Sequence, residues 1–397
     1  MEREKVIVYT ASSVGLDYFF FLSRTIENAG YRVKPLYIIT ELEYRSLSRS
    51  NRFNKVVLRL KMYLLYPFYL ILHGLLAKKG SVFVVTSNTF FAPFLVRFVF
   101  FRKSIKVVHV LYDLFPDALE VAGKLHSNSI LYRLFGRVTS YTLANCDYTI
   151  YLGDFLKKHT EDRWGKARCS GVIDISTDLT LYSDKFLSLK NTSKVIVHYG
   201  GQLGHLHDAD TMISCIKFVL NSDIKENVKF NFYVSGSQAS YLEQSLKGLG
   251  VEILSTIASA QWRNDIREFH VGLVSLSPGG ASVCLPSKTY GMMTGGMAIL
   301  AICPEWSDLA DLVLKANGGK VVNNSMHLES KHIDSPIRSV SHREIDLIVH
   351  DFYTSLKDFV CDRDKLESMR FNAFIGVRNN YTIEHLSLQW KMVLDKV

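Results

Sequence analysis

A carboxylate and a histidine stand at the end of one apolar stretch, where they could do acid–base chemistry. The segment KVVHVLYDLFPDALE (106–120) reads as a buried strand that ends near Asp113, with His109 four residues earlier. In an open α/β sheet a carboxylate at the carboxyl end of a strand faces the ligand crevice, where it can take a hydroxyl proton or stabilise a cationic group. Asp113 could instead cap a helix, and His109 could be an ordinary core histidine.

A lysine and a serine begin a helical pattern later in the chain, in SPGGASVCLPSKTYGMMTGGMAIL (277–300). Proline near the first turn pre-sets the backbone, Ser287 can cap the helix, and Lys288 adds positive charge beside free N–H groups. This arrangement predicts a site for a diphosphate. The alternative is that Lys288 is a solvated lysine at a helix start.

A glycine-rich turn follows a strand pattern in VHYGGQLGHLHDADTMI (197–213). Gly200, Gly201 and Gly204 would let the backbone approach a ligand closely, and the helix expected from about Asp208 would present its N-terminal N–H groups to a phosphate. An ordinary strand-to-helix turn has the same pattern. The sequence contains neither GxGxxG at this turn nor a Walker motif.

Alternating strand and helix patterns are expected to position these residues. A chain of 397 residues exceeds the roughly 250–300 at which single cores stop growing, so two domains are expected. The alternation predicts βαβ units and parallel, buried sheets in both halves. The expected strands are 6–11, 31–39, 82–87, 106–112 and 148–153 in the first half, and 195–201, 230–236, 251–254, 271–276, 297–303 and 319–323 in the second.

The domain boundaries follow from a polar segment without apolar periodicity. Residues 176–194 are predicted to be the linker between a first domain, 1–175, and a second, 195–365. Helical patterns continue to the end of the chain. We expect the helices of 366–397 to pack back on the first domain.

Charge is distributed unevenly along the chain. The net charge is +9, and residues 1–175 hold 25 Lys and Arg against 14 Asp and Glu, whereas residues 176–397 hold 22 against 24. Between Tyr44 and Tyr112 there are 12 basic residues, no acidic residue, and 14 Phe and Tyr. Basic residues beside apolar ones suit an anionic bilayer surface. The aromatic residues of this stretch stand next to aliphatic residues in the sequence, and this pattern argues against nucleic acid as the partner.

An apolar run, 62–77, lies inside this stretch between Lys61 and Lys78. It is shorter than the roughly 20 residues of a spanning helix, so we expect it to lie on a membrane or in a core. A second patch, 90–103, mixes Phe with Arg97, Arg102 and Lys103.

Cysteine usage and the N-terminal sequence bear on localisation. The six cysteines lack CxxC spacing, which favours a reduced cytosolic compartment and predicts no metal site. The opening MEREKVIVYT has no signal-peptide core. We therefore expect a peripheral protein on the cytoplasmic face of a membrane.

The order of motifs resembles that of GT-B glycosyltransferases. It is similar to the family-four-like enzymes of bacterial surface-polysaccharide synthesis, over nearly the whole chain. The resemblance implies an α/β fold of two Rossmann-like domains facing a central cleft, with the nucleotide-sugar in the second domain and the acceptor in the first. The motifs are YGGQLG (199–204), VSGS (234–237), LPSK (285–288), SDLADLV (307–313) and NGGKVV (317–322).

The resemblance also implies roles for individual residues. The donor diphosphate would be approached by Gly200, Gly201, Gly204 and Gly15, and it would be bound by Ser287 and Lys288. The base and ribose would lie near Gly236, Ile257 and Ala258, and the donor sugar would lie near Gly279 and Gly280 in a mobile loop. The catalytic residues would be Asp113 and His109.

One position departs from the family pattern. Three residues after the lysine the family usually has a glutamate that holds the ribose hydroxyls, and here the residue is Gly291. The pair of glutamates eight positions apart is absent too, with Val283 and Gly291 in its place. Either the ribose is held otherwise or donor binding has been lost.

The resemblance implies transfer of a hexose or N-acetylhexosamine from a nucleotide-diphosphate donor, most often UDP, to a lipid-linked saccharide, with retention and without metal or other cofactor. A nucleotide-sugar 2-epimerase shares the fold but would not need the acid-free surface. A non-catalytic partner subunit, anchoring an active enzyme at the membrane, is favoured by Gly291.

Overall fold

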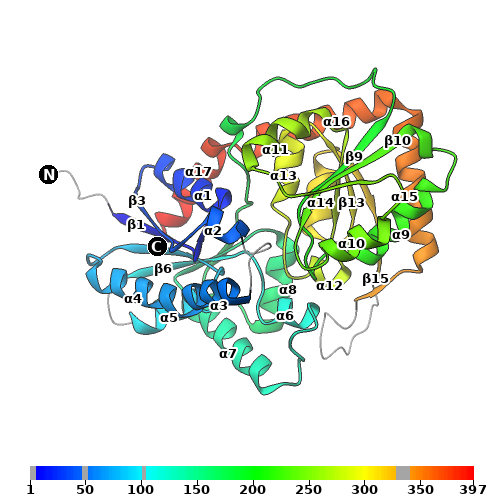
Figure 1. The fold of residues 1–397 in the computed structure, drawn as a ribbon. Coiled ribbons are helices and arrows are strands. Elements are labelled where there is room, and N and C mark those ends of the chain that lie inside the picture. The colour runs from blue at the N-terminus through cyan, green and yellow to red at the C-terminus, as the bar shows by residue number, and fades with distance from the viewer. Residues whose placement is uncertain (1–5, 47–51, 101–103, 328–339) are drawn as a thin grey trace. The chain divides into compact units, whose positions relative to one another are not determined.

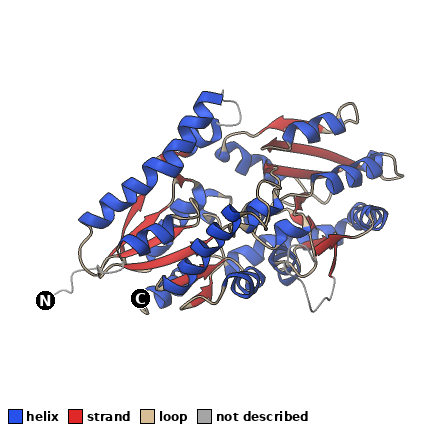
Figure 2. Cartoon of the chain, turned by 90° about the horizontal axis from the view of Figure 1, so that it is seen from below, coloured by secondary structure: helices blue, strands red, loops and turns tan. Residues whose placement is uncertain are grey.

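The computed structural model describes residues 6–46, 52–100, 104–327 and 340–397. Two compact units make up the chain, and each is described by itself. Unit 1 comprises Met1–Ser176 and Thr382–Val397, and unit 2 comprises Thr177–Tyr381. Figure 2 shows helices covering the sheets of the molecule.

A six-stranded parallel sheet forms the centre of unit 1, in the order β3-β1-β5-β6-β7-β8. Its inner strands are almost entirely apolar because helices bury both faces. The strands are β1 (Ile7–Ala11), β3 (Arg32–Leu36), β5 (Val82–Thr86), β6 (Lys106–Leu111), β7 (Tyr148–Tyr151) and β8 (Ser170–Val172), with a small pair β2 (Val14–Gly15) and β4 (Ile39–Thr40) beside it.

Alternate residues of these strands contribute to two separate hydrophobic cores. Val84 and Val108 pack with helices α1 and α17 on one face, and Phe83 and Val107 pack with α4 and α5 on the other. The helices of unit 1 are α1 (Asp17–Asn28), α2 (Glu41–Ser46), α3 (Arg52–Leu60), α4 (Tyr66–Leu76), α5 (Ala92–Val99), α6 (Asp117–Val121), α7 (Ile130–Asn145), α8 (Asp154–Trp164) and α17 (Ile383–Leu394).

The C-terminal helix α17 completes unit 1, as expected. It packs along α1 and contributes Leu386 and Trp390 to the core. The hydroxyl of Ser387 donates to the carbonyl of Thr25 at 2.8 Å, which fixes the register of the two helices. The predicted return of the chain's end to the first domain is therefore confirmed for this helix.

Unit 2 repeats the architecture with a six-stranded parallel sheet in the order β11-β10-β9-β12-β13-β14. The predicted pair of doubly wound α/β sheets is confirmed. The strands are β9 (Val195–Gln202), β10 (Val228–Ser235), β11 (Glu252–Ser255), β12 (Val271–Ser275), β13 (Ala298–Ile302) and β14 (Gly319–Val322), with a small antiparallel pair β15 (Ser325–His327) and β16 (Val340–His342).

Helices cover both faces of this sheet, with α15 packing on α9 and α16 packing on α13 and β13. They are labelled in Figure 1. The helices of unit 2 are α9 (Ala209–Leu220), α10 (Ala239–Leu246), α11 (Ser259–Asp265), α12 (Pro278–Ala281), α13 (Lys288–Thr294), α14 (Asp308–Lys315), α15 (Ile345–Cys361) and α16 (Arg363–Asn380).

The segment before β9 is polar but packed, and it lies on α16 within unit 2. The Phe186 ring contacts the ring of Phe374 at a centroid distance of 5.5 Å. The guanidinium of buried Arg370 stacks on Phe186 and donates to the carbonyl of Leu187 at 3.2 Å. Helix α16 therefore belongs to unit 2, and the chain returns to unit 1 only from Thr382, later than the predicted 366.

Candidate functional site

Lys288 is a buried cation in unit 2. Its Nζ is shielded from solvent, has no hydrogen-bond partner in the described part of the chain, and lies 3.7 Å from the centroid of the Tyr199 ring. Burial lowers the pKa of Lys288 to about 7. The alternative of a solvated lysine is wrong, because solvent does not reach the ammonium group. A buried ammonium group with no hydrogen-bond partner in the described residues is a place where an anion can bind.

The glycine turn after β9 lies beside this lysine. Gly201 has φ of 108°, and a Cβ added there would lie 3.7 Å from Cδ of Lys288. A Cβ added at Gly204 would meet open space. Two segments that are far apart in sequence, the turn and the start of α13, are therefore brought to one place at the carboxyl edge of the sheet.

Ser287 precedes α13 and is exposed. The prediction that its side chain caps this helix is wrong, since it makes no capping hydrogen bond and its backbone is already helical. Its place next to Lys288 leaves it a candidate ligand of a phosphate.

The start of α9 is not an open anion site. Buried Asp208 accepts from the backbone N–H of Thr211 at 3.3 Å and from the side-chain amide of Asn324 at 2.7 Å. This carboxylate takes the place at the helix terminus that the sequence assigned to a phosphate. Lys288, and not the α9 terminus, thus stays the predicted anion-binding group of this region.

His207 lies near Lys288, and the sequence analysis did not predict it as a site residue. Its Nδ1 donates to the carbonyl of Ser275 at 2.5 Å. Burial lowers the pKa of His207 to about 3, and the charge of Lys288 contributes to this. His207 is therefore neutral and adds no second charge. The sequence signal was its position in the glycine turn.

The residues assigned to the base and ribose lie on neighbouring turns of unit 2. Gly236 follows β10 with φ of 106° and packs so closely on Leu203 that a Cβ would lie 2.7 Å from its carbonyl oxygen. Ala258, after Ile257, precedes α11. These assignments stay predictions.

Gly291 is covered by aromatic rings. A Cβ added at Gly291 would lie 2.8 Å from Oη of Tyr182 and 3.0 Å from the indole of Trp262. A glutamate at this position would collide with both rings. The indole also fills the space over Gly200, where an added Cβ would lie 2.6 Å from Nε1. Packing against the indole, without any ligand, already accounts for glycine at position 200.

Gly279 and Gly280 do not lie in a mobile loop. They belong to the short helix α12, whose first turn is capped because the hydroxyl of Ser277 accepts from the N–H of Gly280 at 3.0 Å. A Cβ added at Gly280 would lie 2.0 Å from the carbonyl oxygen of Leu206. The role at the donor sugar stays a prediction.

In unit 1, Asp113 follows β6 at the carboxyl edge of the sheet. Its side chain is accessible to solvent, but the surrounding protein reduces its hydration and raises the pKa of Asp113 to about 6. The hydroxyl of Ser87 accepts from the N–H of Asp113 at 3.2 Å and so fixes the turn. Asp113 does not cap α6, since Pro116 occupies the cap position.

His109 and Asp117 are both enclosed. His109 is buried in β6, burial lowers its pKa to about 3, and its Nδ1 has no hydrogen-bond partner in the described residues. Asp117 is paired with Arg163 and accepts from Nε1 of Trp164 at 2.6 Å. Of the two aspartates in segment 106–120, Asp113 is therefore the one that solvent reaches. The catalytic role of His109 stays a prediction.

Gly15 lies in β2, where an added Cβ would lie 2.9 Å from the ring of Tyr37 and 3.0 Å from that of Phe20. This packing explains why the residue is a glycine. Its role at the donor diphosphate stays a prediction.

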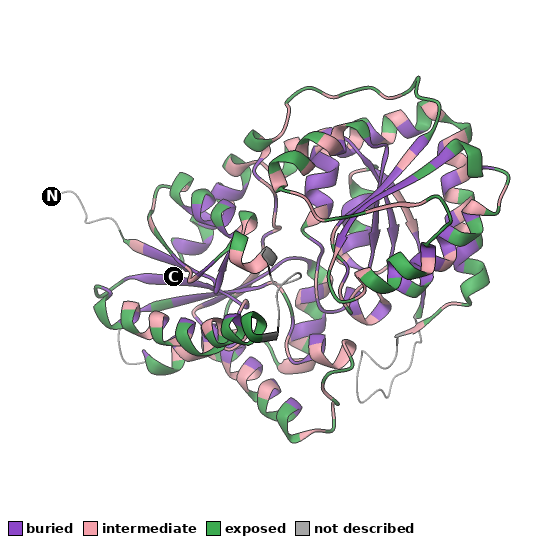
Figure 3. Ribbon diagram, viewed as in Figure 1, coloured by how far each residue is buried: buried purple, intermediate pink, exposed green. Residues whose placement is uncertain are grey.

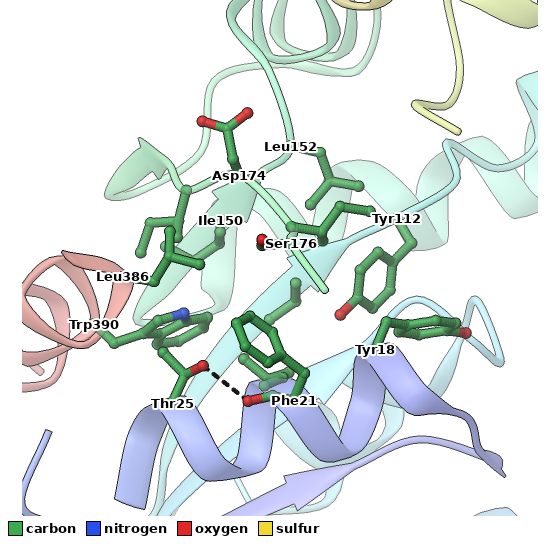
Figure 4. A pocket seen from close by; sticks show the side chains of 14 residues that line it. Tyr18, Phe21, Thr25, Tyr112, Ile150, Leu152, Asp174, Ser176, Leu386 and Trp390 are labelled. Carbon is green, nitrogen blue, oxygen red and sulfur yellow. Dashed lines mark hydrogen bonds between the residues drawn. The ribbon is translucent and has the colours of Figure 1, made fainter. Parts of the chain in front are cut away.

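A narrow pocket, which the sequence did not predict, opens at the carboxyl ends of β6, β7 and β8 in unit 1 (Figure 4). Apolar side chains line most of it, including Phe21 and Trp390, and Tyr18 and Tyr112 close one end. Tyr112 directly precedes Asp113. The pocket could not be read from the sequence because α17, one of its walls, comes from the end of the chain.

One face of unit 1 is apolar and exposed. Residues Phe53–Leu76 form a continuous helix of 24 residues through α3, a π-helical turn Lys61–Leu65 and α4, and only 17% of its most apolar stretch is buried. By length and composition it could cross a membrane. However, Tyr66, Leu70 and Gly74 are buried against the rest of unit 1, so one face of α4 is occupied. Figure 3 shows the rest of this helix largely exposed.

The neighbouring helices extend this face. Helix α4 packs on α5, and α5 packs on α7. Arg97 of the second patch is partly buried near Asp147, whereas Arg102 and Lys103 lie outside the described residues. The large exposed apolar side chains are Phe53, Val56, Val57, Leu60, Tyr63, Leu64, Leu65, Phe68, Leu72, Leu75 and Leu76 on the long helix, Phe98 and Val99 on α5, and Ile130, Leu131 and Leu134 on α7.

No group of three or more His, Cys, Asp or Glu side chains that could hold a metal ion occurs among the residues that the structure describes.

Comparison with known proteins identifies the fold. The structure superposes on sucrose-phosphate synthase from Thermosynechococcus elongatus with a TM-score of 0.67 and 11% identity over 99% of each chain. It superposes on Anabaena HepE in complex with UDP with a TM-score of 0.66 and 14% identity over 99% of this chain and 100% of that one. The chain therefore has the GT-B fold, and the resemblance to GT-B glycosyltransferases is confirmed at the level of fold.

A protein of similar sequence is also described as a glycosyltransferase. The probable glycosyltransferase WbjE of Pseudomonas aeruginosa is 24% identical over 255 residues, which are 60% of this chain and 61% of that protein. The match thus spans less than two thirds of the relative. No family model matches the chain.

Proposed function

We propose that this protein is a glycosyltransferase that binds a UDP-sugar in unit 2 and transfers the hexose or N-acetylhexosamine to a saccharide acceptor bound by unit 1. The observation that carries the proposal is the buried ammonium of Lys288, which has no hydrogen-bond partner in the described chain and lies beside Gly201. Burying a charge is costly unless a partner compensates it, and a diphosphate would do so. HepE, which shares the fold, has been crystallised with UDP-glucose.

Each side chain has a chemical task in this reaction. The bond between the sugar and the diphosphate breaks, the acceptor hydroxyl forms the new bond, and the negative charge of the departing UDP is stabilised by Lys288. Asp113, whose pKa is raised to about 6, is mainly ionised at neutral pH and would take the proton of the acceptor hydroxyl or stabilise the cationic sugar. Retention of configuration is what the family resemblance implies.

The exposed apolar face of unit 1 supports a lipid-linked acceptor. The long helix presents apolar side chains outward and carries exposed Lys55 and Arg59, and exposed Lys78 and Lys79 follow its end. Such a helix, with its inner side packed on the protein, would lie in the plane of an anionic bilayer. We therefore place the protein peripherally at the cytoplasmic face of the membrane, in surface-polysaccharide synthesis, the role implied by the family resemblance.

Calorimetry with UDP, UDP-glucose, UDP-N-acetylglucosamine and GDP tests the donor site. Tighter binding of the UDP compounds than of GDP, followed by sugar transfer to lipid-linked saccharides in a product assay, would support the proposal. A folded protein that binds none of these nucleotides would overturn it.

A second candidate is a non-catalytic partner subunit, which the packing of Trp262 over Gly291 favours because no carboxylate can stand at that position. In that case liposome binding would persist without nucleotide binding. Measurable nucleotide affinity together with turnover would exclude this candidate.

A further inference from the structure

The indole of Trp262 packs over two glycines that lie near Lys288. It lies over Gly200, the neighbour of Gly201, whose added Cβ would face Cδ of Lys288. It also lies over Gly291, one turn along α13 from Lys288. Two glycines in different elements therefore make room for one ring, and that ring stands next to the place proposed for the diphosphate.

The orientation of this indole is fixed by a short chain of hydrogen bonds. Nε1 of Trp262 donates to Nε2 of His198 at 3.0 Å, and Nδ1 of His198 donates to the carbonyl of Asn231 at 2.8 Å. The His198 ring stacks on Phe269 with centroids 4.7 Å apart. Burial lowers the pKa of His198 to about 4, so the ring is neutral and Nε2 stays an acceptor.

The consequence is an aromatic ring beside position 291, which carries no carboxylate. The N–H of Trp262 is already used, and the residue remains partly accessible to solvent. The hydroxyl of Tyr182 lies near the same Gly291 position and accepts from the hydroxyl of Thr177 at 3.3 Å. The indole therefore offers a partly exposed ring surface near Lys288.

We propose, resting on the function proposed above, that Trp262 is the surface against which the donor's nucleoside lies. With no carboxylate at position 291 to hold the ribose hydroxyls, 2′-deoxyribonucleoside diphosphates then bind as well as ribonucleoside ones. Bases stack on aromatic rings with little dependence on the sugar. A site that hydrogen-bonds a hydroxyl rejects the analogue lacking it by large factors, whereas a site without such partners does not. Thymidine-diphosphate sugars are then a donor class open to this protein.

Calorimetry on the wild-type chain with UDP, 2′-deoxy-UDP and inorganic pyrophosphate tests this without any mutation. We expect the dissociation constants of UDP and 2′-deoxy-UDP to agree within about threefold, because no carboxylate stands at position 291 to hold the 2′-hydroxyl. A preference for UDP of more than about tenfold would overturn the inference while leaving the glycosyltransferase proposal intact. Failure of all three ligands to bind would instead refute the function on which the inference rests.

Replacing the ring provides an independent test. Trp262→Leu should weaken UDP binding by about 5- to 150-fold, the range that loss of one base–aromatic stack produces, and should leave pyrophosphate binding nearly unchanged. Trp262→Phe, which keeps a ring, should retain most of the affinity. Unchanged UDP affinity in a folded Trp262→Leu protein, or an equal loss for UDP and pyrophosphate, would contradict the assignment.

Fluorescence covers the case in which Trp262→Leu does not fold. UDP should quench the emission of the wild type and of Trp390→Phe, a variant in unit 1, to the same extent. It should not quench that of Trp262→Phe. Quenching that survives in Trp262→Phe would overturn the inference.

Discussion

The ammonium of Lys288 lies 3.7 Å from the centroid of the Tyr199 ring and has no hydrogen-bond partner among the described residues. A cation–π contact offsets only part of the cost of burying a charge. The remaining cost is what a bound diphosphate would offset under the proposed function.

Lys288→Ala should weaken UDP binding by about ten- to a hundredfold, since it removes a charge-assisted contact worth about 1.5–3 kcal/mol. Calorimetry measures the change. Lys247→Ala, which removes an exposed lysine from the same unit, is the matched control and should leave the affinity as it is. If Lys288→Ala folds and binds UDP like the wild type, Lys288 is not part of the site.

The affinity for UDP should depend on pH through the same residue. Burial lowers the pKa of Lys288 to about 7, and a bound diphosphate would raise it again by favouring the charged form. Binding then takes up a proton above pH 7, so affinity should fall as the pH rises from 7 to 9, by at most about tenfold per unit. In Lys288→Arg, whose guanidinium stays charged, this dependence should vanish. An equally steep decline in that variant would assign it to another group.

Asp113→Asn should leave UDP affinity nearly intact and lower kcat by a factor of about 10² or more, as expected for a group that acts only in the chemical step. Because the pKa of Asp113 is raised to about 6 and its ionised form is the active one, kcat of the wild type should fall as the pH drops through 6. Asp162→Asn removes an exposed carboxylate of unit 1 and should change neither quantity. Unaltered turnover in Asp113→Asn would direct the search to His109.

Periodicity alone predicted both sheets because each inner strand, such as β5 and β13, is apolar on both faces, and that pattern has few alternative structures. Lys288 was identified from the proline and serine that precede it. Its burial was not predicted, because Tyr199 contacts it only in the folded chain. Trp262 was missed for the same reason, since it lies 29 residues before Gly291 and nothing local marks the contact.

The same limit applies to the α9 terminus. Asp208 was visible in the sequence at the helix start, but its capping bond to Thr211 and its contact with distant Asn324 appear only when the sheet is assembled.

The last prediction concerns the exposed face of unit 1. Lys61 is half-buried and paired with Glu43 at 2.8 Å, whereas Lys55, Arg59, Lys78 and Lys79 are exposed. The test changes the three exposed lysines, Lys55, Lys78 and Lys79. Each such lysine near an anionic bilayer contributes about 1 kcal/mol. Changing all three to Glu should therefore lower binding to anionic liposomes by a factor of 100 or more, about 3 kcal/mol or greater in sum.

A matched control changes Lys217, Lys225 and Lys247 of unit 2 to Glu, which alters the net charge equally on residues that are also exposed. It should bind liposomes like the wild type, because the effect is local and charge is screened over about 10 Å at 0.1 M salt. Phe68→Ser with Leu75→Ser, both exposed on the long helix, should weaken the part of binding that survives high salt. Co-sedimentation with liposomes of varied anionic content measures all of these, and equal binding of the wild type to neutral and anionic liposomes would count against the membrane assignment.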